Sequence, residues 1–405
     1  MSNTFDCALI IASRCNIALK NIPLFSRRFI RLQAVQHLYA FYVCKQANYD
    51  WALDQIRNDC TPDIFADPTT DKAQLAQTVK QAMALFESSL SSPTVPLVAS
   101  PGSCVSTVAA RALAHYESEL AKDVCRLEEG FQEAVMKINR ACVRIWQLLV
   151  EWSYIAQKQT ERPQLNQQHT PIASGCLSHS PILQCLQNDH VLSKLVQQNG
   201  AGWSAHMPLV EDWYNQFVKK DPIVQNDLEH PMTPSQDQQL LVFMVEKIIF
   251  NKKTIQAFFS DVDLQWSAHK HIARRLVHEG LSPFMKNSGK SLDVDVLGSA
   301  ARWESEQDFY NDLIHRTLQR DEELELLIAQ KVQKWSIDRI MLLDKTIIKL
   351  ALCEMLYFVN IPIKVSINEY IALSKDYSMP KSSQFINGLL DAVAATLHSG
   401  VNSEI

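Results

Sequence analysis

A basic segment near the N-terminus contains the residues best suited to bind an anion. Residues 7–49 contain no Asp or Glu but do contain Arg14, Lys20, Arg27, Arg28, Arg31 and Lys45. Arg27 and Arg28 precede Arg31 by four and three residues, so the three side chains can share one helical turn. Cations in a first turn oppose the helix dipole at about 0.3–1 kcal/mol each, whereas an anionic ligand would favour them there. The segment therefore indicates phosphate binding, with a solvated face or ion pairs to distant carboxylates as the alternative.

Other candidate sites carry weaker signals. His269 and His271 would point about 200° apart on a helix, which does not suit a shared metal ion. Residues 287–291 imitate the end of a phosphate-binding loop, but the required Gly would fall at Phe284 and no strand precedes it. The acidic run at 321–323 is placed to cap a helix. We expect no enzyme activity, no cofactor and no metal.

The sequence around the basic segment predicts helices. Gly occurs only 10 times in 405 residues, which disfavours turn-rich β folds. Apolar periodicity predicts helices over 27–48 (with Ser26 as N-cap), 71–90, 105–158, 237–259 and 264–279, and a nearly continuous helical pattern from 302 onward. The predicted buried stripe of the first helix is Leu32, Val35, Tyr39, Tyr42 and Val43. The predicted fold class is all-α.

The C-terminal quarter has the clearest local signals. Residues 337–359 predict a core helix, and Ser366 with Glu369 predicts a capping box at the start of the next one. Pro380 suits the first turn of a last helix, whose stripe is predicted to be Phe385, Leu389, Val393 and Leu397. Gly388 within that helix predicts close helix packing.

Charge and cysteine content limit the possible partners and the cellular compartment. The net charge of −5 means that any nucleic-acid role must rest on a local patch. The ten Cys are single, without a CxxC pair, as is typical of a reducing compartment. The apolar run at 8–12 is too short for a membrane span, so we expect a cytoplasmic protein without a membrane partner.

Several motifs taken in order resemble the NusB family. They are RRFIR at 27–31 and AVQHLY at 34–39, then WSIDRI at 335–340, IKLALCEM at 348–355, IPIKVSINE at 361–369 and FINGLLD at 385–391. The resulting division is an extension at 1–25, a basic first helix at 26–48, a mostly helical insertion at 49–300, and a C-terminal bundle at 301–399.

The resemblance implies a two-bundle helical protein that works in transcription antitermination. Such proteins bind single-stranded boxA-type RNA together with NusE, a small-subunit ribosomal protein. The complex helps RNA polymerase read through terminators in ribosomal RNA operons. By position, the implied RNA contacts are Arg27, Arg28, Arg31, Gln36, Tyr39, Lys381, Ser382 and Phe385. Arg31 is the leading one, while Tyr39 and Phe385 could pack in the core instead of stacking on bases.

Two other functions are compatible with the sequence. One is a helical protein-interaction module without RNA binding, which the acidic charge and the large insertion favour mildly. The other is the RNA-binding part of a ribosomal RNA methyltransferase system, although no Gly-rich methyl-donor loop on a strand is present.

Overall fold

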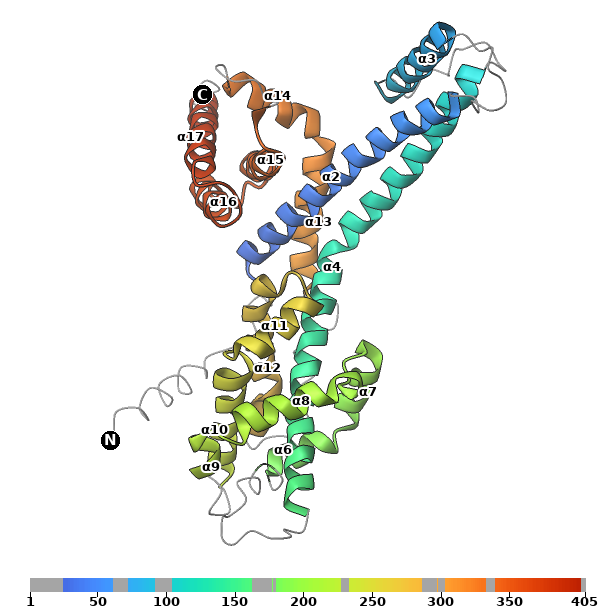
Figure 1. Ribbon diagram of the computed structural model, residues 1–405. Helices are drawn as coiled ribbons and strands as arrows, with labels where there is room; N and C mark the ends of the chain where they lie inside the picture. Colours follow the sequence, from blue (N-terminus) through green and yellow to red (C-terminus); the bar gives the residue numbers. More distant parts are fainter. Residues whose placement is uncertain are drawn as a thin grey trace. The chain divides into compact units, whose positions relative to one another are not determined.

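The computed structural model describes residues 25–60, 72–91, 104–161, 177, 180–226, 233–285, 297, 303–332 and 339–401. Every element in these ranges is a helix (Figure 1), so the all-α prediction is confirmed. The predicted extension at 1–25 lies outside the described residues except for Phe25. The chain divides into two compact units. We call Arg27–Phe131 with Gln307–Ile405 the terminal unit, and Gln132–Glu306 the central unit.

The N-terminal part of the terminal unit is a helical arm. It consists of α2 (Arg27–Cys60), α3 (Lys72–Ser91) and α4 (Cys104–Glu161) as far as Phe131. Figure 1 shows α2 and the first half of α4 side by side and antiparallel, joined by hydrogen bonds such as that from Asn48 to Asp123. The predicted end of the first helix at 48 is wrong. The helix continues because Ala52, Ile56 and Cys60 are buried in a cluster with Phe86 of α3 and Tyr116 of α4.

The C-terminal part of the terminal unit packs around one helix, α15 (Leu342–Tyr357). It contacts α2 and three neighbouring helices (Figure 1): α14 (Asp321–Lys331), α16 (Ile363–Tyr377) and α17 (Ser382–Val401). A further helix, α13 (Glu304–Gln319), leads into this bundle. Because helices surround it, α15 is buried from Ile347 to Met355 without interruption, including Lys349 and Glu354.

Three local predictions for this bundle need correction. The core helix begins at Leu342 rather than 337, because Met341 has extended backbone; residues 333–338 lie outside the described ranges. The helix predicted to be capped by Ser366 begins earlier, at Ile363, and Ser366 is buried in its interior. Gly388 is exposed, and an added Cβ would meet no atom within 4 Å, so it does not serve close packing.

The central unit is built from mostly short helices around the second half of α4. They are α6 (Pro181–Gln187), α7 (His190–Asn199), η2 (Ser204–His206), α8 (Met207–Trp213), η3 (Tyr214–Val218), α9 (Pro222–Asn226), α10 (Pro234–Phe243), η4 (Met244–Ile249), α11 (Lys253–Val262) and α12 (Trp266–Met285). Aromatic rings form much of the core, with Trp203, Trp213 and Phe258 in mutual contact. Gly280 of α12 lies directly against the ring of Trp146, which leaves no space for a side chain.

His269, which could suggest a metal site, makes a structural contact with a carboxylate instead. His269 is buried in the central unit with Nδ1 2.6 Å from Asp263. Within the described ranges, no three His, Cys, Asp or Glu side chains come close enough to hold a metal ion. Among the described helices, none combines the length and apolar character that a bilayer-crossing segment needs.

Candidate nucleic-acid interface

The first turn of α2 presents two exposed arginines. The guanidinium of Arg27 lies over the ring of Phe309, 4.0 Å from its centroid. Arg28 Nη2 donates to Asp376 Oδ2 at the end of α16 over 3.0 Å, with the two side chains 49% and 55% exposed. Exposed pairs of this kind contribute only about 0–1 kcal/mol. A phosphate group can therefore compete with Asp376 for Arg28.

Arg31 is placed differently from its two neighbours. Its Nε and Nη2 donate to both oxygens of Glu354 at 2.8 Å, and the two side chains are 3% and 0% exposed. The spacing does bring the three arginines to one end of α2, but α15 packs against the side on which Arg31 lies. This placement corrects the expectation that Arg31 faces a phosphate, because doing so would leave Glu354 charged, buried and unpaired.

Glu354 is the centre of a buried network that joins three helices. Besides the two hydrogen bonds from Arg31 of α2, it accepts one from Ser366 Oγ (2.6 Å) and one from Tyr370 Oη (3.3 Å), both on α16. Burial lowers the pKa of Arg31, but the hydrogen bonds and the charge of Glu354 outweigh burial and raise it. Burial and the charge of Glu354 raise the pKa of Tyr370 well above its usual range. The network thus holds the start of α2, with the exposed Arg27 and Arg28, against the bundle.

The next predicted contacts along α2 are partly accessible. Gln36 is half-buried and accepts a hydrogen bond from Gln33 Nε2 at 3.3 Å. Tyr39 is 38% exposed, and Val43 is exposed as well. The predicted buried stripe is therefore wrong at Tyr39 and Val43, whereas Tyr42 is half-buried, and the partly exposed ring of Tyr39 can stack on a base.

Of the predicted contacts at the start of α17, Ser382 is buried, whereas Lys381 and Phe385 are exposed. Ser382 is buried, and its Oγ donates to Asp344 Oδ2 at 2.7 Å while Ser378 donates to the other oxygen of Asp344. Ser382 is thereby corrected from an RNA contact to a residue that fastens the turn between α16 and α17 to α15. Lys381 is exposed, and Phe385 is 37% exposed rather than part of a core stripe.

The site also includes residues that sequence reasoning missed. Asp376 pairs with Arg28; the exposed Tyr377 ends α16, and the exposed Met379 lies in the turn that follows. Burial, and then the charge of Asp376, raises the pKa of Tyr377. Large apolar residues in a turn between two helices are a signal that could have identified this surface. Within the described residues, no hydrogen bond, ion pair or ring contact joins Arg28 to Lys381 or Phe385.

Comparison with known proteins supports the family resemblance. Residues 271–395 match the family model described as "NusB family". The "Transcription antitermination protein NusB" of Chloroherpeton thalassium is 41% identical over 86 residues, which are 21% of this chain and 41% of that protein. The protein of the same name from Oleidesulfovibrio alaskensis is 44% identical over 89 residues, 22% of this chain and 58% of that protein. No solved structure matches this chain.

The matched segments cover different shares of these relatives. The chain spans between 41% and 59% of the length of four such curated relatives. It spans more of the antitermination protein NusB of Bacillus mycoides, which is 36% identical over 104 residues, 26% of this chain and 80% of that protein. Together with the helical bundle around α15, this similarity shows that the chain belongs to the NusB family.

Proposed function

We propose that this chain is an RNA-binding transcription antitermination factor. It binds single-stranded boxA-type RNA together with NusE, and this complex acts with RNA polymerase to promote read-through in ribosomal RNA operons. The names of the family relatives, which are transcription antitermination proteins, support a role in antitermination. The observation that carries the RNA proposal is the pair of exposed arginines in the first turn of α2, which the Glu354 network holds in place. On this proposal the protein is a cytoplasmic adaptor without catalytic activity or cofactor.

The exposed residues suit a single-stranded RNA. Arg27, Arg28 and Lys381 can hold phosphates, because Arg and Lys supply several N–H donors and a positive charge. Tyr39 and Phe385 can stack on unpaired bases, which splay out in single strands. Two arginines in a chain of net charge −5 support modest affinity, so a second protein that shares the RNA would add substantially to binding.

Fluorescence anisotropy with a labelled boxA-type RNA tests the proposal. The protein is titrated with and without purified NusE at two salt concentrations. Changing Arg27 and Arg28 together to Glu should weaken binding by about tenfold or more and flatten the salt dependence, which scales with the number of phosphate contacts. Lys80→Glu is the matched control, because Lys80 is an exposed lysine on α3 of the same unit. Equal affinity of the double variant and the parent protein would refute the arginine site.

The absence of RNA binding under every condition would refute the proposal as a whole. A protein-interaction module would then be favoured. Candidate contacts of such a module are Leu326 and Val359 of the terminal unit, which are large apolar residues and strongly exposed.

A further inference from the structure

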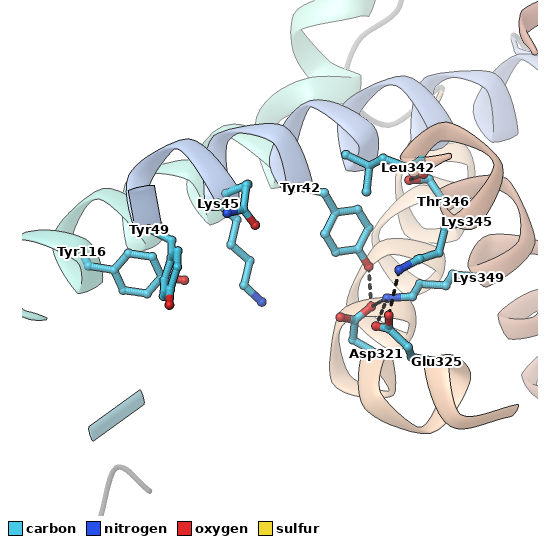
Figure 2. A pocket seen from close by; sticks show the side chains of 11 residues that line it. Tyr42, Lys45, Tyr49, Tyr116, Asp321, Glu325, Leu342, Lys345, Thr346 and Lys349 are labelled. Atoms are coloured by element: carbon cyan, nitrogen blue, oxygen red, sulfur yellow. Dashed lines mark hydrogen bonds and ion pairs between the residues drawn. The ribbon is translucent and has the colours of Figure 1, made fainter. Parts of the chain in front are cut away.

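A pocket lies in the terminal unit where the arm meets the bundle, away from the first turn of α2. Its volume is about 390 Å³, within the range of about 300–1,000 Å³ that holds small ligands. The lining comes from α2 and α4 on one side and from α14 and α15 on the other (Figure 2). It consists of Tyr42, Lys45, Gln46, Tyr49, Tyr116, Asp321, Glu325, Leu342, Lys345, Thr346 and Lys349.

The arm supplies an aromatic wall. Figure 2 shows Tyr49 and Tyr116 next to each other. Both rings pack on Phe86, with centroids 5.9 Å and 6.0 Å from it, and Tyr49 Oη donates to Glu87 at 3.0 Å. Tyr49 remains half-buried, whereas Tyr116 is buried behind it. The rings are therefore held in place before any ligand arrives, which lowers the entropic cost of stacking.

The bundle supplies a charged wall in which both carboxylates are already neutralised. Asp321 accepts hydrogen bonds from Tyr42 Oη (2.5 Å) and Lys349 Nζ (2.6 Å). Glu325 accepts from Lys349 Nζ and Lys345 Nζ, both at 3.0 Å. These groups leave little unbalanced negative charge for the cationic side chain of a protein partner.

Lys45 gives the lining of the pocket a net positive charge. It is exposed and makes no ion pair within the described part of the chain. In Figure 2 its ammonium group points into the space between the tyrosines and the charged wall. With Lys345 and Lys349, the lining has three lysines against two carboxylates. A ligand with an aromatic ring and a negative charge therefore fits better than a cationic peptide.

We propose that this pocket binds a nucleotide of the same single-stranded RNA that Arg27 and Arg28 hold. The base stacks on Tyr49, with Tyr116 behind it, and the phosphate lies against Lys45. The inference rests on the proposed RNA-binding function. Lys45 lies 17 residues beyond Arg28 on α2, which is about 25 Å along the helix axis. A nucleotide in this pocket therefore lies outside the RNA segment that contacts the first turn of α2. The pocket thus determines the length of RNA that the protein binds.

The test uses the full chain and RNAs of increasing length. A core boxA-type RNA and versions extended at the 5′ or the 3′ end are titrated by anisotropy. One extension should improve affinity by about tenfold, as expected for one stacked base with a phosphate contact. Lys45→Glu and Tyr49→Leu should each abolish most of this gain while leaving the affinity for the core RNA unchanged. Lys80→Glu should retain the full gain, and circular dichroism melts identify any variant that does not fold.

Photo-crosslinking gives a second readout that does not depend on a variant. An extended RNA with 5-iodouridine in the added segment should crosslink to the peptide containing Tyr49, as identified by mass spectrometry. Binding of the core RNA without any gain from extension would overturn this inference and leave the proposed function intact. So would a Lys45→Glu variant that weakens NusE binding but not RNA binding, since the pocket would then hold a protein. Failure of all RNAs to bind would instead refute the proposed function.

Discussion

The guanidinium of Arg31 donates two hydrogen bonds of 2.8 Å to the carboxylate of Glu354, across 323 positions of the sequence. The pair joins the first helix of the terminal unit to the central helix of its bundle. Because both side chains are buried, they neutralise each other's charge and do not contact a ligand. The arginine that looked most like an RNA contact is instead what holds the other two in position.

Replacing one member of this pair should strongly destabilise the terminal unit. Glu354→Ala leaves Arg31 charged and buried, with an expected cost of about 3–5 kcal/mol in the free energy of unfolding. The comparison is Asp376→Ala, which removes the partner of the exposed Arg28 and should cost less than about 1 kcal/mol. Urea titration followed by circular dichroism measures both. Equal costs for the two variants would contradict the assignment of Glu354 as the centre of the network.

Asp376 should restrain RNA binding. Its carboxylate occupies Arg28 and places a negative charge where a phosphate must approach. Asp376→Asn should therefore tighten binding of boxA-type RNA by about two- to fivefold at low salt, with a smaller gain at high salt because salt screens the exposed charge. Anisotropy titrations at two salt concentrations measure the change. Asp54→Asn removes a similarly exposed carboxylate further along α2 and should have little effect. An unchanged or weaker affinity of Asp376→Asn would count against an RNA contact by Arg28.

Two glycines should respond to alanine in opposite directions. Gly388 is exposed within α17, and an added Cβ meets no atom within 4 Å. Gly388→Ala should therefore stabilise the protein by about 0.5–1 kcal/mol through higher helix propensity. Gly280→Ala should destabilise it, because the new methyl group would overlap the buried ring of Trp146. Thermal melts compare the two variants with the parent protein. Stabilisation by both would contradict the close approach of Trp146.

Asp263 should make the stability of the central unit depend on pH. Burial raises the pKa of Asp263, but the hydrogen bond and charge of His269 outweigh burial, so the net shift is downward. A lowered carboxyl pKa stabilises the fold at pH values above its unfolded pKa of about 3.9 and loses this effect as pH falls further. The stability difference between the parent protein and Asp263→Asn should thus be largest at neutral pH and shrink below about pH 4. Urea titrations at several pH values measure it. A difference that grows on acidification would refute the downward shift.

Much of the helical fold is determined by local sequence. Apolar periodicity identifies the long helix α4, and the family motifs identify the segments that become α15, α16 and α17. These signals work because helix formation and termination depend on residues within a few positions of one another. The same signals locate the positive segment at the start of α2, whose Arg27 and Arg28 are exposed. The end of α2 escaped prediction because packing on α3 and α4, rather than local propensity, extends it to Cys60.

Which side chains face solvent depends on how the helices pack against one another. Arg31, Ser366 and Ser382 have the residue types of surface or capping groups, yet each is buried against a carboxylate supplied by α15. Tyr39 and Phe385 have the spacing of core residues, yet both retain exposed faces. Periodicity tells which residues share a side of a helix but not which neighbour covers that side. The pocket at Lys45 arises for the same physical reason, because its two walls come from segments more than 200 residues apart that meet only on folding.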